Sequence, residues 1–240
     1  MSNKATPARR NTFKSPKPDP IRLLVFDILQ EVNQRGGYSN LLLPSALTDS
    51  KFEQRDKGFA TELLYGTLRM QGRHDYIAAQ ISDRPWSEVD NGIVDVIRLG
   101  AHQLFEMRVA THAAVSETVE LARKVLGESK ASFVNAMLRK MSAQTLDQWM
   151  EPVNQIKDDV ERLAIIHSHP EWIVSAYFDL LKDFSEVESA LIANNIPANI
   201  NRKLFAFENW KDYDEDLYFT IQDALLKKIR SSHFKIMGFD

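Results

Sequence analysis

Hydrophobic positions in the first part of the chain repeat at helical spacing. Apolar residues recur every three or four positions, which places them on one face of an amphipathic helix. No segment of residues 21–142 shows the sustained alternation that a half-buried strand requires. The pattern predicts a mostly α fold, with about seven short helices packed as a bundle. The predicted helices cover residues 21–35, 40–47, 56–71, 74–81, 89–107, 111–126 and 129–141.

Several residues mark where these helices end or where they pack closely. Thr111 is a plausible N-cap, and Gly127 is a plausible stop for the same helix. Gly66 and Gly100 lie inside predicted helices, where glycine costs about 1 kcal/mol relative to alanine. We therefore expect a neighbouring helix to approach closely at these two glycines.

The pattern changes beyond residue 142. A connector over residues 143–157, with room for a single helical turn, leads into a helical linker that ends at Asn195. Pro170 is expected in the first turn of its second helix, and Ser185 to Glu188 resembles a capping box that opens its third. Residues 196–240 predict a small partial α+β segment, with strands near both ends and a helix between them. Residues 1–20, rich in proline and poor in large apolar residues, predict a disordered arm.

Composition limits the class of protein and its location. The chain of 240 residues is 44% hydrophobic and 26% charged, which is ordinary for a globular protein. Its apolar runs fall short of the roughly 18–20 residues that cross a bilayer, and its N-terminus lacks the apolar region of a signal peptide. The chain has no cysteine, so it offers neither a disulfide nor a thiolate nucleophile. We expect a cytoplasmic protein that does not bind membranes.

Charge is distributed unevenly behind a net value of −3. The first 20 residues carry five Lys or Arg against one Asp, whereas residues 21–142 are balanced at 15 against 15. Residues 143–240 hold 10 basic against 17 acidic residues. A cationic arm on a near-neutral body suits contact with phosphates, because neutralising phosphates releases counterions. The alternative is that this N-terminal segment is simply solvated and binds no ligand, which the same composition also allows.

Candidate catalytic groups are not arranged as a known active site. The sequence has no nucleotide-binding glycine loop, and its histidines fit helix ends or the core, with His102 inside an apolar helix. We therefore predict no catalytic, cofactor-binding or metal-binding residue. The basic residues are placed more specifically, in pairs on helices, although cations near a helix C-terminus are also favoured by its dipole alone. The predicted RNA-binding residues are Arg9, Arg10, Lys14, Lys17, Arg22, Arg69, Arg73, Arg123, Lys124, Arg139 and Lys140.

Five motifs in order resemble a known family. They are Tyr38-Ser39-Asn40, the segment Phe59 to Arg69, the segment Ile97 to Leu104, the segment His112 to Arg123 and the segment Phe133 to Arg139. This part of the chain resembles the N-terminal region of the Sun/RsmB (Fmu) ribosomal-RNA cytosine-C5 methyltransferases, which has the fold of the antitermination factor NusB. The stretches His169 to Val174 and Asn194 to Pro197 continue the resemblance into that family's linker.

The resemblance implies that catalysis belongs to a second domain. In the family, a Rossmann-like domain binds S-adenosylmethionine, and two cysteines there carry out the methyl transfer. This chain has no cysteine, so we predict that alone it is inactive and holds no cofactor. It is expected to be a fragment, a truncated gene product or an isolated N-terminal region. The implied function is to dock ribosomal RNA for the catalytic domain. Methyltransferase activity belongs to the parent family and is not expected of this chain alone.

Two alternatives stay open at the level of sequence. The chain could be a stand-alone NusB-like factor for transcription antitermination or ribosome assembly, which binds RNA together with a protein partner. It could also be a helical protein-interaction module with no RNA role, which the near-neutral body allows. The extension after residue 142 favours the methyltransferase family over the first alternative. In none of these cases is DNA an expected partner.

Overall fold

A computed structural model describes residues 17–196 as a helical protein. Ten α-helices and two short 3-10 helices account for the regular structure of this range, and no strand occurs in it. The mostly α fold expected from periodicity is confirmed. The predicted arm and the predicted α+β segment lie outside the described residues, except for Lys17 to Pro20 and Ile196.

The chain divides into two compact units, each of which has its own core. Among the described residues, the first contains residues 17–65 and 83–143, and the second contains residues 66–82 and 144–196. The helices up to residue 143 are α1 (Pro20–Arg35), α2 (Ser39–Thr48), α3 (Gln54–Ile81), the 3-10 helix η1 (Trp86–Glu88), α4 (Asn91–Phe105), α5 (Thr111–Leu126) and α6 (Glu128–Met141). Helix α3 begins in the first unit and ends in the second.

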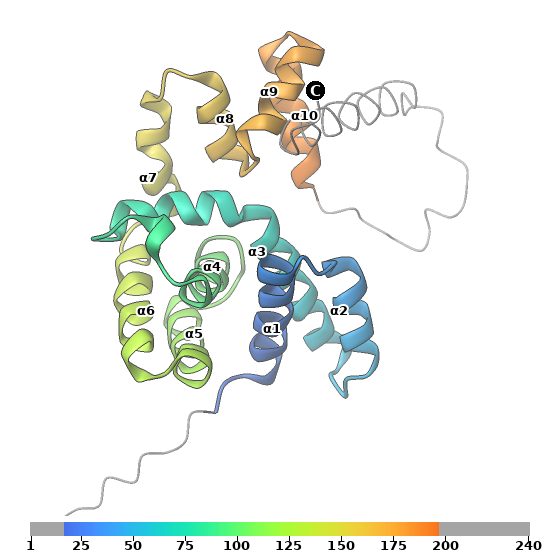
Figure 1. The fold of residues 1–240 in the computed structure, drawn as a ribbon, viewed down its shortest axis with the longest axis vertical. Coiled ribbons are helices and arrows are strands. Elements are labelled where there is room, and N and C mark those ends of the chain that lie inside the picture. The colour runs from blue at the N-terminus through green and yellow to red at the C-terminus, as the bar shows by residue number, and fades with distance from the viewer. Residues whose placement is uncertain (1–16, 197–240) are drawn as a thin grey trace, which may run out of the picture. The chain divides into compact units, whose positions relative to one another are not determined.

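Helix α4 forms the centre of the first unit. Its residues are buried around most of the helix, including Val96, Ile97 and Leu99, which are fully buried. A helix that is buried around most of its surface has to be covered by neighbouring helices on several sides. Helices α1, α5 and α6 pack against α4 and supply this cover, as Figure 1 shows.

Of the glycines in α4, Gly100 is the one that the neighbouring helices approach most closely. A Cβ atom placed on Gly100 would lie 2.6 Å from Leu138 Cδ2 and 3.2 Å from Thr118 Cγ2. The expected close approach at this glycine is therefore confirmed. Gly66 is buried as well.

The prediction of two separate helices over residues 56–71 and 74–81 is wrong. The sequence predicted a break near Gly72, whereas the structure shows one continuous helix of 28 residues. Gly72 allows Ser168 to approach, since an added Cβ would lie 3.2 Å from Ser168 Oγ. The backbone N–H of Arg73 donates to the same hydroxyl at 3.2 Å. A glycine inside a helix thus marks a close contact here and not a helix end.

Three predicted helix starts also need correction. Thr111 is the first residue of α5 and not its cap, because Ala110 holds the N-cap position without a side-chain hydrogen bond. Asp183, and not Ser185, caps α10 by accepting from the N–H of Glu186 at 2.9 Å. Pro170 is the N-cap of α9 and lies just before its first turn. The predicted stop at Gly127 is confirmed, with φ of +90°.

The second unit contains a smaller helical core. Beyond residue 143 it contains α7 (Leu146–Met150), the 3-10 helix η2 (Glu151–Gln155), α8 (Asp159–His167), α9 (Glu171–Leu181) and α10 (Phe184–Asn195). Leu163 of α8, Val174 and Tyr177 of α9, and Val187 and Leu191 of α10 form its buried cluster. The single helical turn expected in residues 143–157 is present as α7, which has a capping box formed by Thr145 and Gln148.

Candidate nucleic-acid interface

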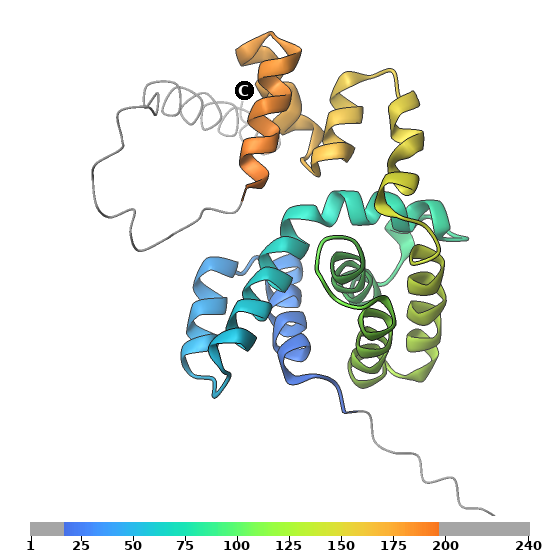
Figure 2. The ribbon, with the colours of Figure 1, turned by 180° about the vertical axis from the view of Figure 1, so that it is seen from behind.

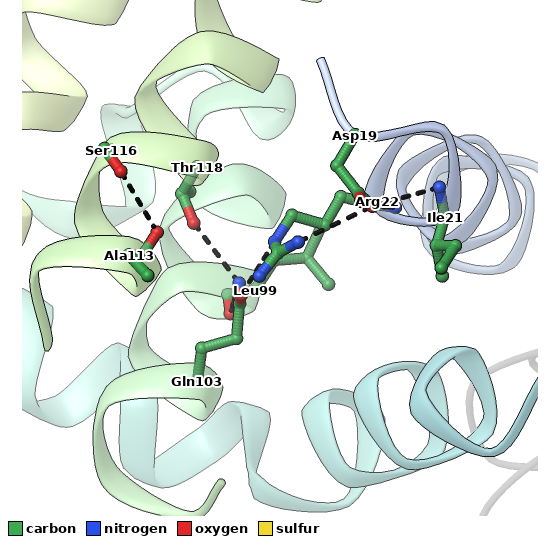
Figure 3. A network of polar contacts seen from close by, with 8 residues as sticks. All are labelled: Asp19, Ile21, Arg22, Leu99, Gln103, Ala113, Ser116 and Thr118. Carbon is green, nitrogen blue, oxygen red and sulfur yellow. Dashed lines mark hydrogen bonds and ion pairs between the residues drawn. The ribbon is translucent and has the colours of Figure 1, made fainter. Parts of the chain in front are cut away.

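Arg22 is buried in the core of the first unit, although the sequence placed it among the RNA-binding residues. Its Nε donates to Gln103 Oε1 at 2.8 Å, and its guanidinium lies 5.0 Å from the centre of the Phe59 ring. Asp19, the N-cap of α1, lies 3.5 Å from the same group. Figure 3 shows Arg22 reaching from α1 toward Gln103 on α4, which also donates to Thr118 on α5 at 3.2 Å. We therefore leave Arg22 out of the candidate interface.

Arg123 is on the surface of α5 but is neutralised by neighbouring carboxylates. It forms ion pairs with Glu120, one turn earlier, and with Glu128 at 3.0 Å. Hydrogen bonds to Glu128 and Glu120 raise the pKa of the Arg123 guanidinium above its ordinary value. A phosphate approaching Arg123 would have to compete with both carboxylates.

Four other predicted cations are exposed in the first unit. They are Lys17, just before α1, Lys124 on α5, and the adjacent pair Arg139 and Lys140 on α6. Among the described residues, none of these four side chains has a hydrogen-bond or ion-pair partner. The three on α5 and α6 belong to one helical hairpin, because only Gly127 separates the two helices.

The remaining predicted residues fall elsewhere. Arg69 and Arg73 are partly buried on the part of α3 that belongs to the second unit. Arg73 NH1 donates to the carbonyl of Ile166 at 3.5 Å, so this side chain takes part in packing within that unit. Arg9, Arg10 and Lys14 lie outside the described residues.

An open groove runs between α5 and α6, with a volume of about 640 Å³. Both views of the ribbon show these two helices side by side (Figures 1 and 2). Residues at helical spacing line both walls. The α5 wall comprises Thr111, His112, Val115, Ser116, Val119, Glu120 and Arg123, and the α6 wall comprises Asn135 and Arg139, followed by Ser142.

The groove brings together two residues that the sequence proposed separately. Arg123 and Arg139 line the same hollow, although they are 16 positions apart in the chain. Sequence reasoning missed Asn135, a partly buried polar residue that lies one turn before Arg139. The sequence shows Asn135 as a polar residue between Val134 and Met137, both of which are buried in the structure. That Asn135 lines a groove became visible only because the structure places α5 beside α6.

The groove is lined by groups that can form hydrogen bonds with a ligand. Its guanidinium, amide, imidazole and hydroxyl groups can bond phosphate oxygens or the edges of planar ligands, whereas the Glu120 carboxylate repels anions. Within residues 17–196, no group of three His, Asp or Glu side chains is placed to hold a metal ion. His102 lies in the core as expected, with its Nε2 3.4 Å from Glu62 Oε1. In the same range, no helix is long and apolar enough to span a membrane.

The fold and the groove define a class: an α-helical domain built around a central buried helix, with cations on one hairpin. Residues 19–143 match the NusB family, and the chain belongs to that family. The chain is 36% identical over 193 residues, 79% of its length, to a Mycobacterium tuberculosis protein that carries a provisional methyltransferase name. It is 34% identical over 160 residues, 65% of its length, to ribosomal RNA small subunit methyltransferase B of Pseudomonas putida. These comparisons confirm the family resemblance drawn from the motifs.

The chain spans less than half of the length of these relatives, 42% of the first and 33% of the second. Among solved structures, it is similar to NusB of T. maritima, at 20% identity and a TM-score of 0.49. That likeness covers 56% of this chain and 99% of the T. maritima chain.

Proposed function

We propose that this chain is the ribosomal-RNA-binding region of a methyltransferase of the small-subunit type. The observation that carries the proposal is the α5–α6 hairpin, where Lys124, Arg139 and Lys140 are exposed and, among the described residues, have no partner. Cations that are not paired within the protein can neutralise phosphates and release their counterions.

The extent of the similarity supports a methyltransferase over a stand-alone factor. The match to the M. tuberculosis relative covers 79% of the chain, which is more than the NusB segment of residues 19–143. The similarity therefore includes part of the second unit. In this proposal the chain docks ribosomal RNA, and a methyltransferase domain that binds S-adenosylmethionine acts on the cytosine. The cysteines would come from that domain, because this chain has none.

The proposal is tested by measuring binding to an in vitro transcript of small-subunit ribosomal RNA as salt rises from about 50 to 200 mM. We expect affinity to fall with salt, and each of the changes Lys124→Ala and Lys140→Ala to reduce the slope of log K against log salt by about 0.7–0.9. Lys51→Ala, an exposed lysine outside the hairpin, is the matched control. Salt-independent affinity, or no binding, would refute the proposal and favour a protein-interaction module.

A further inference from the structure

The α5 wall of the groove presents two apolar residues among polar ones. Val115 and Val119 lie one turn apart on α5, and Val119 is only 5% exposed. Across from them, Asn135 and Arg139 lie one turn apart on α6. An aliphatic surface can contact the flat face of an aromatic ring, and an amide offers both donors and an acceptor to the ring's edge. This combination matches a planar heterocycle better than it matches a bare anion.

Positive charge is available at one end of the groove. Because Gly127 alone joins α5 to α6, the hairpin is antiparallel, and Arg139 near the end of α6 lies toward the beginning of α5. The Arg139 guanidinium has no partner among the described residues, whereas Arg123, toward the other end, is paired with Glu120 and Glu128. An anionic group is therefore favoured at the Arg139 end, and two carboxylates oppose it at the Arg123 end.

We propose that this groove binds one unpaired nucleotide of the RNA, and this inference rests on the proposed function and deepens it. The phosphate would contact Arg139, the base would lie against Val115 and Val119, and the Asn135 amide would hydrogen-bond the edge of the base. The groove's volume of about 640 Å³ falls within the range of about 300–1,000 Å³ that small-molecule sites occupy.

The geometry predicts a preference for single-stranded RNA. In a duplex the faces of the bases are stacked and their pairing edges are occupied, so a groove that uses both cannot bind them. Contacts to phosphate alone would not distinguish the two forms in this way. The preference for unpaired RNA therefore separates nucleotide binding in the groove from general attraction of phosphates to the hairpin.

The first measurement uses the unaltered chain, with NMR of the Val115 and Val119 methyl groups and the Asn135 side-chain amide. The probes are a short single-stranded RNA of mixed sequence and the same RNA annealed to its complement. We expect the single strand to shift all three sets of signals and the duplex to leave them unchanged. If the single strand binds but these signals do not move, the groove is not the nucleotide site.

The second measurement compares variants by fluorescence anisotropy with the same two RNAs. Asn135→Ala is expected to weaken single-strand binding about tenfold, as loss of a specific base contact does, and to leave duplex binding unchanged. Ser132→Ala, which changes an exposed residue one turn earlier on α6, is the matched control. Arg139→Ala should reduce the salt slope for the single strand by about 0.7.

The outcomes distinguish this inference from the proposed function. If the unaltered chain binds both RNAs with strong salt dependence and Asn135→Ala has no effect on either, nucleotide binding in the groove is refuted and RNA binding stands. If the unaltered chain binds neither of these RNAs nor the ribosomal RNA transcript at about 50 mM salt, the proposed function itself fails.

Discussion

The change Arg22→Met tests whether this arginine belongs to the core or to the RNA-binding surface. The substitution keeps an unbranched apolar stem but removes the guanidinium that hydrogen-bonds Gln103 at 2.8 Å. A hydrogen bond to a charged group contributes about 1.5–3 kcal/mol, and the cation–π contact with Phe59 about 0.5–2 kcal/mol. The guanidinium's own desolvation is relieved by the change, which offsets part of that loss. We expect a net destabilisation of the first unit of about 2–3 kcal/mol.

Amide hydrogen exchange in α1 and α4 measures this loss within the first unit. A loss of about 2–3 kcal/mol accelerates exchange of the most protected amides by about 30- to 150-fold, since about 1.4 kcal/mol corresponds to a factor of ten. The matched control is Arg35→Met on the same helix. Arg35 is exposed and pairs only with Glu31 among the described residues, so its change should stay within about 0.5 kcal/mol.

A double-mutant cycle with Gln103→Leu isolates the hydrogen bond itself. Residues in direct contact show coupling energies of about 0.5–3 kcal/mol, so the two changes together should destabilise the unit less than the sum of the single changes. If Arg22→Met leaves exchange unchanged and instead lowers the salt slope of RNA binding, the reasoning is wrong. Arg22 would then contact RNA, as the sequence alone predicted.

Three further predictions concern two glycines and two histidines. Gly100→Ala should destabilise the first unit by about 1–3 kcal/mol, measured by exchange in α4, because the new methyl would meet the buried side chain of Leu138; an unchanged rate contradicts the packing. Gly58→Ala should stabilise α3 by about 0.5–1 kcal/mol, seen as a higher melting temperature, because nothing lies within 4 Å of the added Cβ; a lower value would reveal a hidden contact. Burial lowers the pKa of His167 and of His169 below the ordinary 6.5, although Glu188 opposes the shift at His167 and Arg73 adds to it. As pH falls, these two histidines therefore bind protons in the unfolded chain before they do so in the folded chain. The second unit should lose stability as pH falls below about 6.5. An NMR titration that gives both imidazoles a pKa of 6.5 or higher would contradict this.

The helical fold was largely determined by local sequence. Periodicity predicted the helices of the first unit, because apolar residues that recur every three or four positions share one face of a helix. Gly127 marked a helix end by its conformation, with φ of +90°. Gly72 did not, because its role depends on Ser168, which lies 96 positions later in the chain and fills the space beside the glycine.

The tertiary structure determines whether each arginine is buried, paired or exposed. Arg22, Arg123 and Arg139 are all basic residues on amphipathic helices, and the sequence predicted the same RNA-binding role for all three. Packing buries Arg22 against Gln103, 81 positions away, and the turn at Gly127 brings Glu128 to Arg123. Arg139 alone of the three stays exposed without a partner among the described residues. A charge interacts with whatever lies within a few ångströms of it, and helical periodicity specifies those neighbours only along the same helix.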